Sequence, residues 1–282
     1  MQEGLVDLHV HTTASDGTMS PKQLVKYAKQ KGISALGITD HDTIAGIEEA
    51  GDAGKLLGVE VIPGIEISVD YKGEMHILGY YVKETPKFNK KLEEFKGKRN
   101  ARNLRIIEKL RELGMAISWK EVSEAAGGET VGRPHIAVVL VNKGYTNSIK
   151  STFEKYIGKG KKAYVERDKV EPKEGIELIL EAGGIPVLAH PKYLNLGENQ
   201  LNDLLEKLKD YGLLGIEAYY SMNTKYETGL YLRLAIKHGL ITTGGTDFHG
   251  ENKPEIDIGV GRGNMKLGYK MVQELKARHI CL

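Results

Sequence analysis

Five apolar segments of this 282-residue chain have the length of a β-strand, and each ends at a histidine or an acidic residue. The segments lie at residues 5–10, 33–39, 59–65, 185–189 and 240–246. In proteins built from parallel strands and helices, the carboxyl ends of the strands meet at one edge, where ligand-binding groups gather. The pattern therefore predicts an α/β fold in which groups far apart in the sequence share one site.

Helix signals separate most of these segments, and their repetition favours a closed barrel over an open sheet. Asp42 or Thr43 is expected to cap a helix that Gly58 ends. Residues 59–69 and 74–82 have the composition of strands and are close enough in sequence to pair as a hairpin. With the strand–helix units of the C-terminal half, about seven such units would surround one ligand-bearing edge.

The middle of the chain interrupts this alternation. From residue 86 to about residue 160, the sequence shows one helix signal after another and no convincing strand. We therefore expect residues 1–95 and 161–282 to form the barrel. Residues 96–160 are expected to form an all-helical insertion domain over the mouth of the barrel.

Positive charge is concentrated in and beside this insertion, although the net charge of the whole chain is only +2. Residues 83–111 contain 11 lysines and arginines against 4 acidic residues, and residues 155–173 contain 7 against 3. Most runs of this kind form a solvated helical face. Beside a metal site they can instead attract anions by electrostatic steering. The sequence leaves both interpretations open.

His9 and His11 are the strongest single indication of a metal site. Residues two apart on a strand point to the same face, so both imidazoles can reach one ion. Imidazole is a common protein ligand for zinc, iron and manganese. The other candidate ligands are Asp16, His41, Glu66, His76, His190, Asp247 and His249. Nitrogen and oxygen ligands that recur at one edge of the fold predict a bound transition metal.

The remaining composition limits where such a protein can work. The only cysteine, Cys281, cannot form an intramolecular disulfide and argues against thiolate ligation of the metal. A reducing compartment fits this composition. The N-terminal residues lack the basic and apolar segments of a secretory signal, and no stretch has the length of a membrane span. We expect a cytoplasmic protein without a membrane partner.

Short motifs around the candidate ligands resemble those of a known family. They are Asp7-Leu8-His9-Val10-His11, Ser15-Asp16-Gly17, Thr39-Asp40-His41, Pro63-Gly64-Ile65-Glu66, Leu188-Ala189-His190-Pro191 and Thr246-Asp247-Phe248-His249-Gly250. In this order they resemble the PHP (polymerase and histidinol phosphatase) superfamily of metal-dependent phosphoesterases. The resemblance implies a distorted (β/α)7 barrel. Two more motifs, Gly132-Arg133-Pro134-His135 and Ala163-Tyr164-Val165-Glu166-Arg167, are similar to the branch that acts on nucleotides.

The same resemblance implies a trinuclear metal site. The implied ligands are His9, His11, Glu66 and Asp247 for the first ion, Glu66, His76 and His190 for the second, and Asp16, His41 and His249 for the third. Ligand sets of mixed imidazole and carboxylate suit manganese, iron or zinc without choosing among them. Two or three such divalent ions are therefore the expected cofactors.

A site of this kind would hydrolyse a phosphate ester with a metal-bound hydroxide as the nucleophile. Arg133 and Arg167 would hold a second phosphate through their guanidinium groups, unless they only form salt bridges within the insertion. His135 has three open roles: a substrate contact, a leaving-group acid, or a helix residue that only forms a hydrogen bond. Asp7 and Asp40 are expected to orient ligand histidines or relay protons, so Asp40 and His135 are the candidate catalytic residues.

The predicted function is hydrolysis of nucleotide phosphate esters. The nucleotide branch includes 3′,5′-bisphosphonucleotide phosphatases and a 5′→3′ exoribonuclease, so the expected partner is a phosphorylated nucleotide or a short oligonucleotide. One alternative is a histidinol phosphate phosphatase or another small phosphomonoesterase, although the basic insertion disfavours a cationic substrate. A non-enzymatic nucleic-acid-binding module is the other, and the complete ligand set argues against it. The oligomeric state is open, with a monomer as one option.

Overall fold

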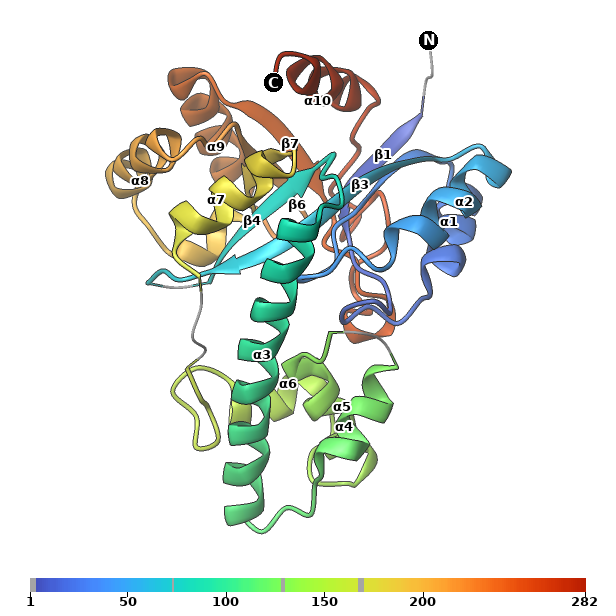
Figure 1. Cartoon of the computed structure of the whole chain (residues 1–282), viewed down its shortest axis with the longest axis vertical. Coiled ribbons are helices and arrows are strands. Elements are labelled where there is room, and N and C mark those ends of the chain that lie inside the picture. Colours follow the sequence, from blue (N-terminus) through green and yellow to red (C-terminus); the bar gives the residue numbers. More distant parts are fainter. Residues whose placement is uncertain (1–3, 73, 128–129, 167–169) are drawn as a thin grey trace.

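The computed structural model describes residues 4–72, 74–127, 130–166 and 170–282 and shows a barrel with a group of helices at one end (Figure 1). The strands of the described residues are β1 (Leu5–Val10), β2 (Ile33–Ile38), β3 (Glu60–Val69), β4 (Met75–Tyr80), β5 (Ile185–Leu188), β6 (Gly215–Tyr220) and β7 (Ile241–Gly245). They lie side by side in their order along the chain. The predicted fold class, a distorted seven-stranded α/β barrel with added helices, is confirmed.

The barrel closes where β7 meets β1. The backbone N–H of Asp247 donates to the carbonyl of His9 at 2.8 Å, and that of His11 donates to Phe248 at 3.0 Å. All neighbouring strands are parallel except β4, which is antiparallel to both β3 and β5. Because β4 runs in the opposite direction, its first residues lie at the edge where the parallel strands end. His76 is therefore brought to the same edge as the other candidate ligands.

Helices on the outside of the strands complete the barrel. They are α1 (Pro21–Gln30), α2 (Ile47–Leu57), α7 (Pro172–Glu181), α8 (Glu198–Asp210), α9 (Lys225–His238) and α10 (Lys270–Ile280), with short 3-10 turns at Pro191–Leu194 and Gly250–Asn252. Their apolar faces pack on the strands; Leu24 and Val25 of α1, for example, are fully buried against Leu36 of β2. Throughout the described part of the chain, no helix combines the length and the apolar composition needed to cross a bilayer.

The helical segment, residues 86–157, lies at one end of the barrel and has its own core (Figure 1). It contains α3 (Pro86–Glu112), α4 (Trp119–Ala126), α5 (Arg133–Asn142), α6 (Ile149–Thr152) and a π-helix at Phe153–Ile157. Phe88 and Phe95 at the start of α3 pack in the barrel core, whereas Ile106 and Leu110 near its end pack with α5. Helix α3 thus contributes side chains to the core of the barrel and to the core of the helical segment. The domain boundaries at 95/96 and 160/161 stay a prediction.

Asp42 is not a helix cap, and that expectation was wrong. Helix α2 begins at Ile47, five residues later, and no side chain caps it. The buried side chain of Asp42 instead accepts hydrogen bonds from the backbone N–H of Ser68 at 3.2 Å and from Nε of Arg99 at 3.2 Å. Arg99 belongs to α3, so the ion pair joins the helical segment to the barrel. The carboxylate of Asp42 faces the guanidinium of Arg99, and the residues near Asp42 in the sequence give no sign of this partner.

Replacing Asp42 with alanine is expected to lower the free energy of unfolding by about 3–5 kcal/mol, because the buried Arg99 guanidinium would lose its carboxylate. Urea unfolding followed by circular dichroism measures this change. Asp52→Ala is the matched control, since Asp52 pairs with Lys55 on the surface. We expect this control to lose less than about 1 kcal/mol. Equal losses in the two variants would contradict a stabilising role for the buried pair.

Candidate metal centre

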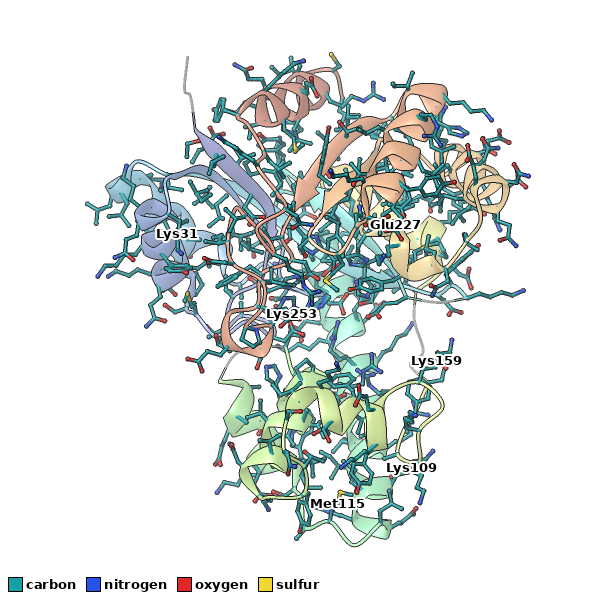
Figure 2. All side chains as sticks on the ribbon, turned by 180° about the vertical axis from the view of Figure 1, so that it is seen from behind. Lys31, Lys109, Met115, Lys159, Glu227 and Lys253 are labelled. Carbon is teal, nitrogen blue, oxygen red and sulfur yellow. The ribbon has the colours of Figure 1, made fainter. Side chains whose placement is uncertain are left out.

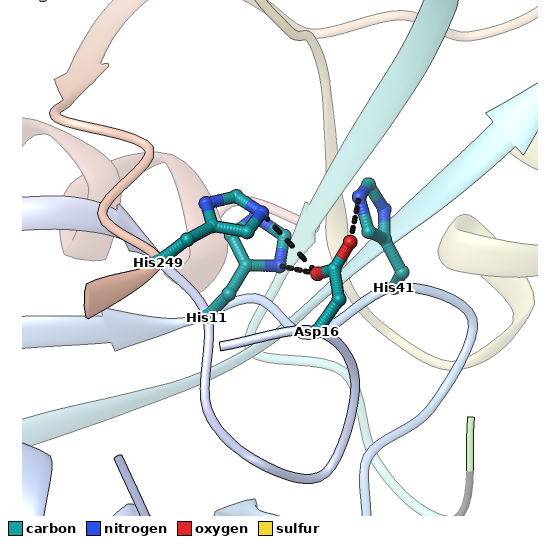
Figure 3. A group of neighbouring side chains, drawn as sticks. All are labelled: His11, Asp16, His41 and His249. Carbon is teal, nitrogen blue, oxygen red and sulfur yellow. Dashed lines mark ion pairs between the residues drawn. The ribbon is translucent and has the colours of Figure 1, made fainter. Parts of the chain in front are cut away.

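The nine predicted ligands converge at the edge of the barrel that faces the helical segment. In each of four groups, one ligand atom from every member lies within 4.8 Å of those of the others. The groups are His11, Asp16, His41 and His249 (Figure 3); His9, Glu66 and His190; His9, His11 and Asp247; and His41, Glu66 and His76. The predicted third set lies within the first group, which His11 joins. The predicted second set is divided between two groups that share Glu66.

Glu66 lies at the centre of these groups and is buried in β3. Its Oε1 atom is 2.8 Å from Nδ1 of His76 and 2.8 Å from Nε2 of His190. Its Oε2 atom is 2.9 Å from Nδ1 of His41 and 3.5 Å from Nε2 of His9. Burial alone would raise the pKa of the Glu66 carboxyl, but the surrounding imidazoles hold it well below its usual range. The carboxylate is therefore ionised and can bridge two cations.

Asp247 presents its two oxygens to different partners. Oδ1 faces the histidines, at 3.2 Å from Nε2 of His11. Oδ2 accepts hydrogen bonds from Nζ of Lys253 at 2.6 Å and from the hydroxyl of Tyr220 at 2.9 Å. Burial opposes ionisation of Asp247, yet Lys253 and His249 hold its pKa well below the usual range. One oxygen is thus fixed by donors while the other stays directed at the ligand cluster.

The chemistry of the buried atoms fits a bound cation. Within the described residues, five buried atoms of the cluster have other ligand atoms near them but none in hydrogen-bond geometry: Nε2 of His9, Nε2 of His11, Nδ1 of His41, Nδ1 of His190 and Oε2 of Glu66. Buried polar atoms without a partner are rare because leaving them unpaired costs about 1–3 kcal/mol each. Convergent lone pairs of nitrogen and oxygen are what a divalent transition metal requires. The residues fit the predicted ions, and the ion count stays a prediction.

Protein purified without a chelator is expected to contain two or three transition-metal ions per chain, because the four ligand groups overlap through shared members. Inductively coupled plasma mass spectrometry measures this stoichiometry. Dialysis against a chelator should remove the ions and abolish hydrolysis, and added Mn²⁺ should restore it. A single tightly bound ion, or full activity of the metal-free chain, would contradict the prediction.

A cavity of about 570 Å³ opens directly over the ligands. The barrel contributes seven of the nine candidate ligands and Lys253, and the helical segment contributes Arg102, Arg133 and Phe153. The loop that follows the π-helix adds Lys159, which is labelled beside the helical segment in Figure 2, where Lys253 is labelled at the adjoining end of the barrel. The basic helical segment therefore faces the ligands, as an anion-attracting surface must. Electrostatic steering of anions requires basic residues on the side that faces the ligands. The steering itself stays a prediction.

Arg133 is held at the cavity by aromatic rings. Its guanidinium carbon lies 5.4 Å from the ring centroid of Phe153 and 6.0 Å from that of Tyr164. One guanidinium nitrogen also donates to the carbonyl of Ile157 at 3.4 Å. No carboxylate in the described part of the chain forms an ion pair with Arg133, so the salt-bridge alternative has no support there. Arg167, the other predicted phosphate contact, lies outside the described residues and stays a prediction.

His135 and Asp40 lie beside the cavity without lining it. Nδ1 of the buried His135 accepts the backbone N–H of Gly132 at 2.9 Å, which is the helix-residue role among the three considered. Asp40 is also buried and accepts hydrogen bonds from Thr12 at 2.7 Å and Ser15 at 2.6 Å. It thereby fixes the loop that carries Asp16. The predicted catalytic roles of Asp40 and His135 stay predictions.

Asp7 hydrogen-bonds backbone groups, and among the described residues no ligand imidazole donates to it. It accepts the backbone N–H of Thr246 at 2.9 Å and that of Gly259 at 2.8 Å. These bonds join β1 to the residues that follow β7. Asp7 thus fixes the backbone next to Asp247, and its predicted role in orienting ligand histidines or relaying protons stays a prediction. Hydrogen bonds between the segments that carry the candidate ligands therefore hold these ligands in place.

Sequence reasoning missed Glu217, which does contact a ligand imidazole. Glu217 lies in β6 with no exposed surface, and its Oε1 atom is 2.9 Å from Nδ1 of His9. The available signal was an acidic residue between Ile216 and Ala218 in a strand predicted to be buried. Lys253 was missed as well, because nothing near it in the sequence shows that it reaches Asp247.

Comparison with known proteins gives a consistent family. A family model described as "PHP domain" matches residues 7–220. A protein from Haemophilus influenzae named 5′-3′ exoribonuclease is 38% identical over 86% of this chain and 89% of its own length. A solved structure from Bifidobacterium adolescentis, described as a metal-dependent phosphoesterase, superposes with a TM-score of 0.86 at 30% identity and covers 96% of this chain and 95% of its own.

Two further relatives carry the names of different activities. A protein from Eggerthella lenta named phosphoribosyl 1,2-cyclic phosphate 1,2-diphosphodiesterase is 33% identical over 87% of this chain and 94% of its own length. A 3′,5′-nucleoside bisphosphate phosphatase from Chromobacterium violaceum is 27% identical over 97% of both chains. The named relatives share phosphoester hydrolysis and differ in the ester that they cleave.

Proposed function

The chain belongs to the PHP domain family and is a metal-dependent phosphoesterase, and we propose that it hydrolyses nucleotides that carry two phosphates. The proposed substrates are nucleoside 3′,5′-bisphosphates and short 5′-phosphorylated RNA. The names of the relatives from Chromobacterium violaceum and Haemophilus influenzae support this class. The observation that carries the proposal is one cavity lined both by candidate ligands of the barrel and by Arg133 of the helical segment.

The two ends of the cavity suit different parts of such a substrate. Divalent ions bound at the nine ligands would neutralise the reacting phosphate and lower the pKa of the attacking water. The guanidinium of Arg133 can bind a second phosphate through two parallel hydrogen bonds. Phe153 and Tyr164 limit its movement, so less conformational entropy is lost when the phosphate binds. Two anchored phosphates would hold the reacting ester in a fixed orientation.

The wall beside Arg133 also favours a nucleoside over a small cationic alcohol. Pro134, Ile149 and Phe153 give this part of the cavity apolar and aromatic surface. Nucleobases stack on such surfaces, with about 1–3 kcal/mol per base in single-stranded complexes. Histidinol phosphate carries no nucleobase, and its amino group would add a positive charge next to Arg133 and Lys159. The histidinol phosphate alternative is therefore the weaker one.

A substrate panel with the Mn²⁺-loaded protein tests this proposal. It compares adenosine 3′,5′-bisphosphate, AMP, a short 5′-phosphorylated RNA, histidinol phosphate and a phosphoribosyl 1,2-cyclic phosphate. We expect the bisphosphate or the RNA to show the highest kcat/KM. The cyclic phosphate is included because of the relative from Eggerthella lenta. The highest kcat/KM for AMP, histidinol phosphate or the cyclic phosphate would refute the assignment.

A further inference from the structure

Glu217 is a buried acidic residue for which phosphoester hydrolysis provides no direct role. It stands in the middle of β6, and its side chain has no exposed surface. Removing a carboxylate from water is strongly unfavourable unless both oxygens find good partners. We therefore expect the buried carboxylate of Glu217 to accept hydrogen bonds from groups that benefit from its negative charge.

Each oxygen of Glu217 bonds one candidate metal ligand. Oε1 is 2.9 Å from Nδ1 of His9, which lies on β1. Oε2 accepts the backbone N–H of His190 at 2.7 Å, directly after β5. His190 has a φ angle of 25°, in a region that residues with side chains rarely adopt. The hydrogen bond that the His190 backbone N–H donates to Glu217 helps to hold His190 in this conformation.

The contact with His9 determines which ring nitrogen is free. A carboxylate can only accept, so the proton of His9 lies on Nδ1 and the lone pair on Nε2. Nε2 is buried, has no hydrogen-bond partner among the described residues, and lies 3.5 Å from Oε2 of Glu66. Metal-binding histidines commonly donate their second N–H to a carboxylate in this way. The arrangement prepares His9 to bind a cation through Nε2.

We propose that Glu217 is a positioning residue for the metal ions bound through His9 or His190. His9 belongs to the group of His11 and Asp247 and, together with His190, to the group of His9, Glu66 and His190. Glu217 touches two of these last three ligands, on the ring of His9 and on the backbone of His190. It makes no hydrogen bond with the separate group of His11, Asp16, His41 and His249 in the described part of the chain. Glu217 therefore sets the affinity of the metal positions that use His9 or His190 and leaves the group of His11, Asp16, His41 and His249 unaffected. This inference rests on the proposed metal site and is independent of the substrate.

The test compares metal binding by the full-length wild-type chain and Glu217→Gln. Glutamine has nearly the same shape but only one accepting oxygen, so it cannot serve both N–H donors. Equilibrium dialysis against buffered free Mn²⁺, with elemental analysis of the protein, measures each class of site. We expect one class to weaken about 10–100-fold while another keeps its affinity. Glu60→Gln is the matched control, because Glu60 pairs with Lys276 and touches no candidate ligand.

Other outcomes would overturn the inference. Unchanged Mn²⁺ affinity at every site in Glu217→Gln would show that Glu217 does not position a ligand. Equal weakening at all sites would show a general structural role. Nitrogen-15 NMR of the histidine rings provides a second measurement, in which Nδ1 of His9 should be protonated in the wild type and altered in the variant. A deprotonated Nδ1 in the wild type would equally refute the proposal.

Two further comparisons keep the result interpretable. If Glu217→Gln does not fold, Glu217→Asp replaces it, since a shorter carboxylate keeps the charge and reaches only one of the two donors. The same loss at one class of site is then expected, and its absence refutes the inference. Failure of the proposed function looks different, because the wild-type chain itself would then fail to bind Mn²⁺ or to cleave the nucleotide panel.

Discussion

Glu66→Ala is expected to lower turnover by about 10³-fold or more while leaving the fold intact. Glu66 belongs to two of the groups and contacts ligands on β1, on β4 and just after β5. Each bound divalent ion contributes several kcal/mol to stabilising charge in the transition state, and about 4 kcal/mol corresponds to 10³ in rate. Turnover under Mn²⁺ saturation, together with metal content and circular dichroism, measures the effect.

Glu60→Ala provides the control on the same strand. Glu60 begins β3 at the opposite end of the barrel, where it pairs with Lys276. This variant removes the same side chain and should keep both its metal content and its turnover. Near-normal turnover of Glu66→Ala would refute the trinuclear assignment. A large loss in Glu60→Ala would show that any damage to β3 impairs the enzyme.

Arg133→Ala is expected to remove most of the preference for substrates with two phosphates. One charge-assisted contact contributes about 1.5–3 kcal/mol, which corresponds to roughly one to two decades in kcat/KM. The loss should appear with adenosine 3′,5′-bisphosphate and be much smaller with p-nitrophenyl phosphate, which has no second phosphate. Arg133→Lys should recover only part of the loss, because an ammonium cannot form two parallel hydrogen bonds. Arg167→Ala is expected to behave as Arg133→Ala does.

The control for this experiment removes a positive charge elsewhere in the helical segment. Lys120 on α4 is 84% exposed and does not line the cavity, so Lys120→Ala should leave both substrates unaffected. Equal losses of Arg133→Ala on both substrates would mean that Arg133 supports the fold or the metal ligands. The assignment of a second phosphate site would then lose its physical basis.

Local sequence signals predicted most of the barrel. Alternation of apolar runs with helix signals located the strands, and the hairpin of β3 and β4 followed from two strand-like runs with a short connection. The same signals missed the start of α2, since Asp42 has the residue type of a cap but bonds Arg99, 57 positions away in the chain. A cap depends on neighbours within one turn, whereas this ion pair depends on how α3 lies over the barrel.

The sequence by itself determined the candidate ligands of this protein, because a histidine or acid at the end of a strand must lie at the common edge. Only the tertiary structure decided which candidate ligands lie close enough to share an ion, that His11 joins the group of Asp16, and that Glu217 bonds His9. It also decided that Asp7 and Asp40 fix loops. The physical reason is that strand position follows from local periodicity, whereas hydrogen bonds between separate strands depend on closure of the barrel.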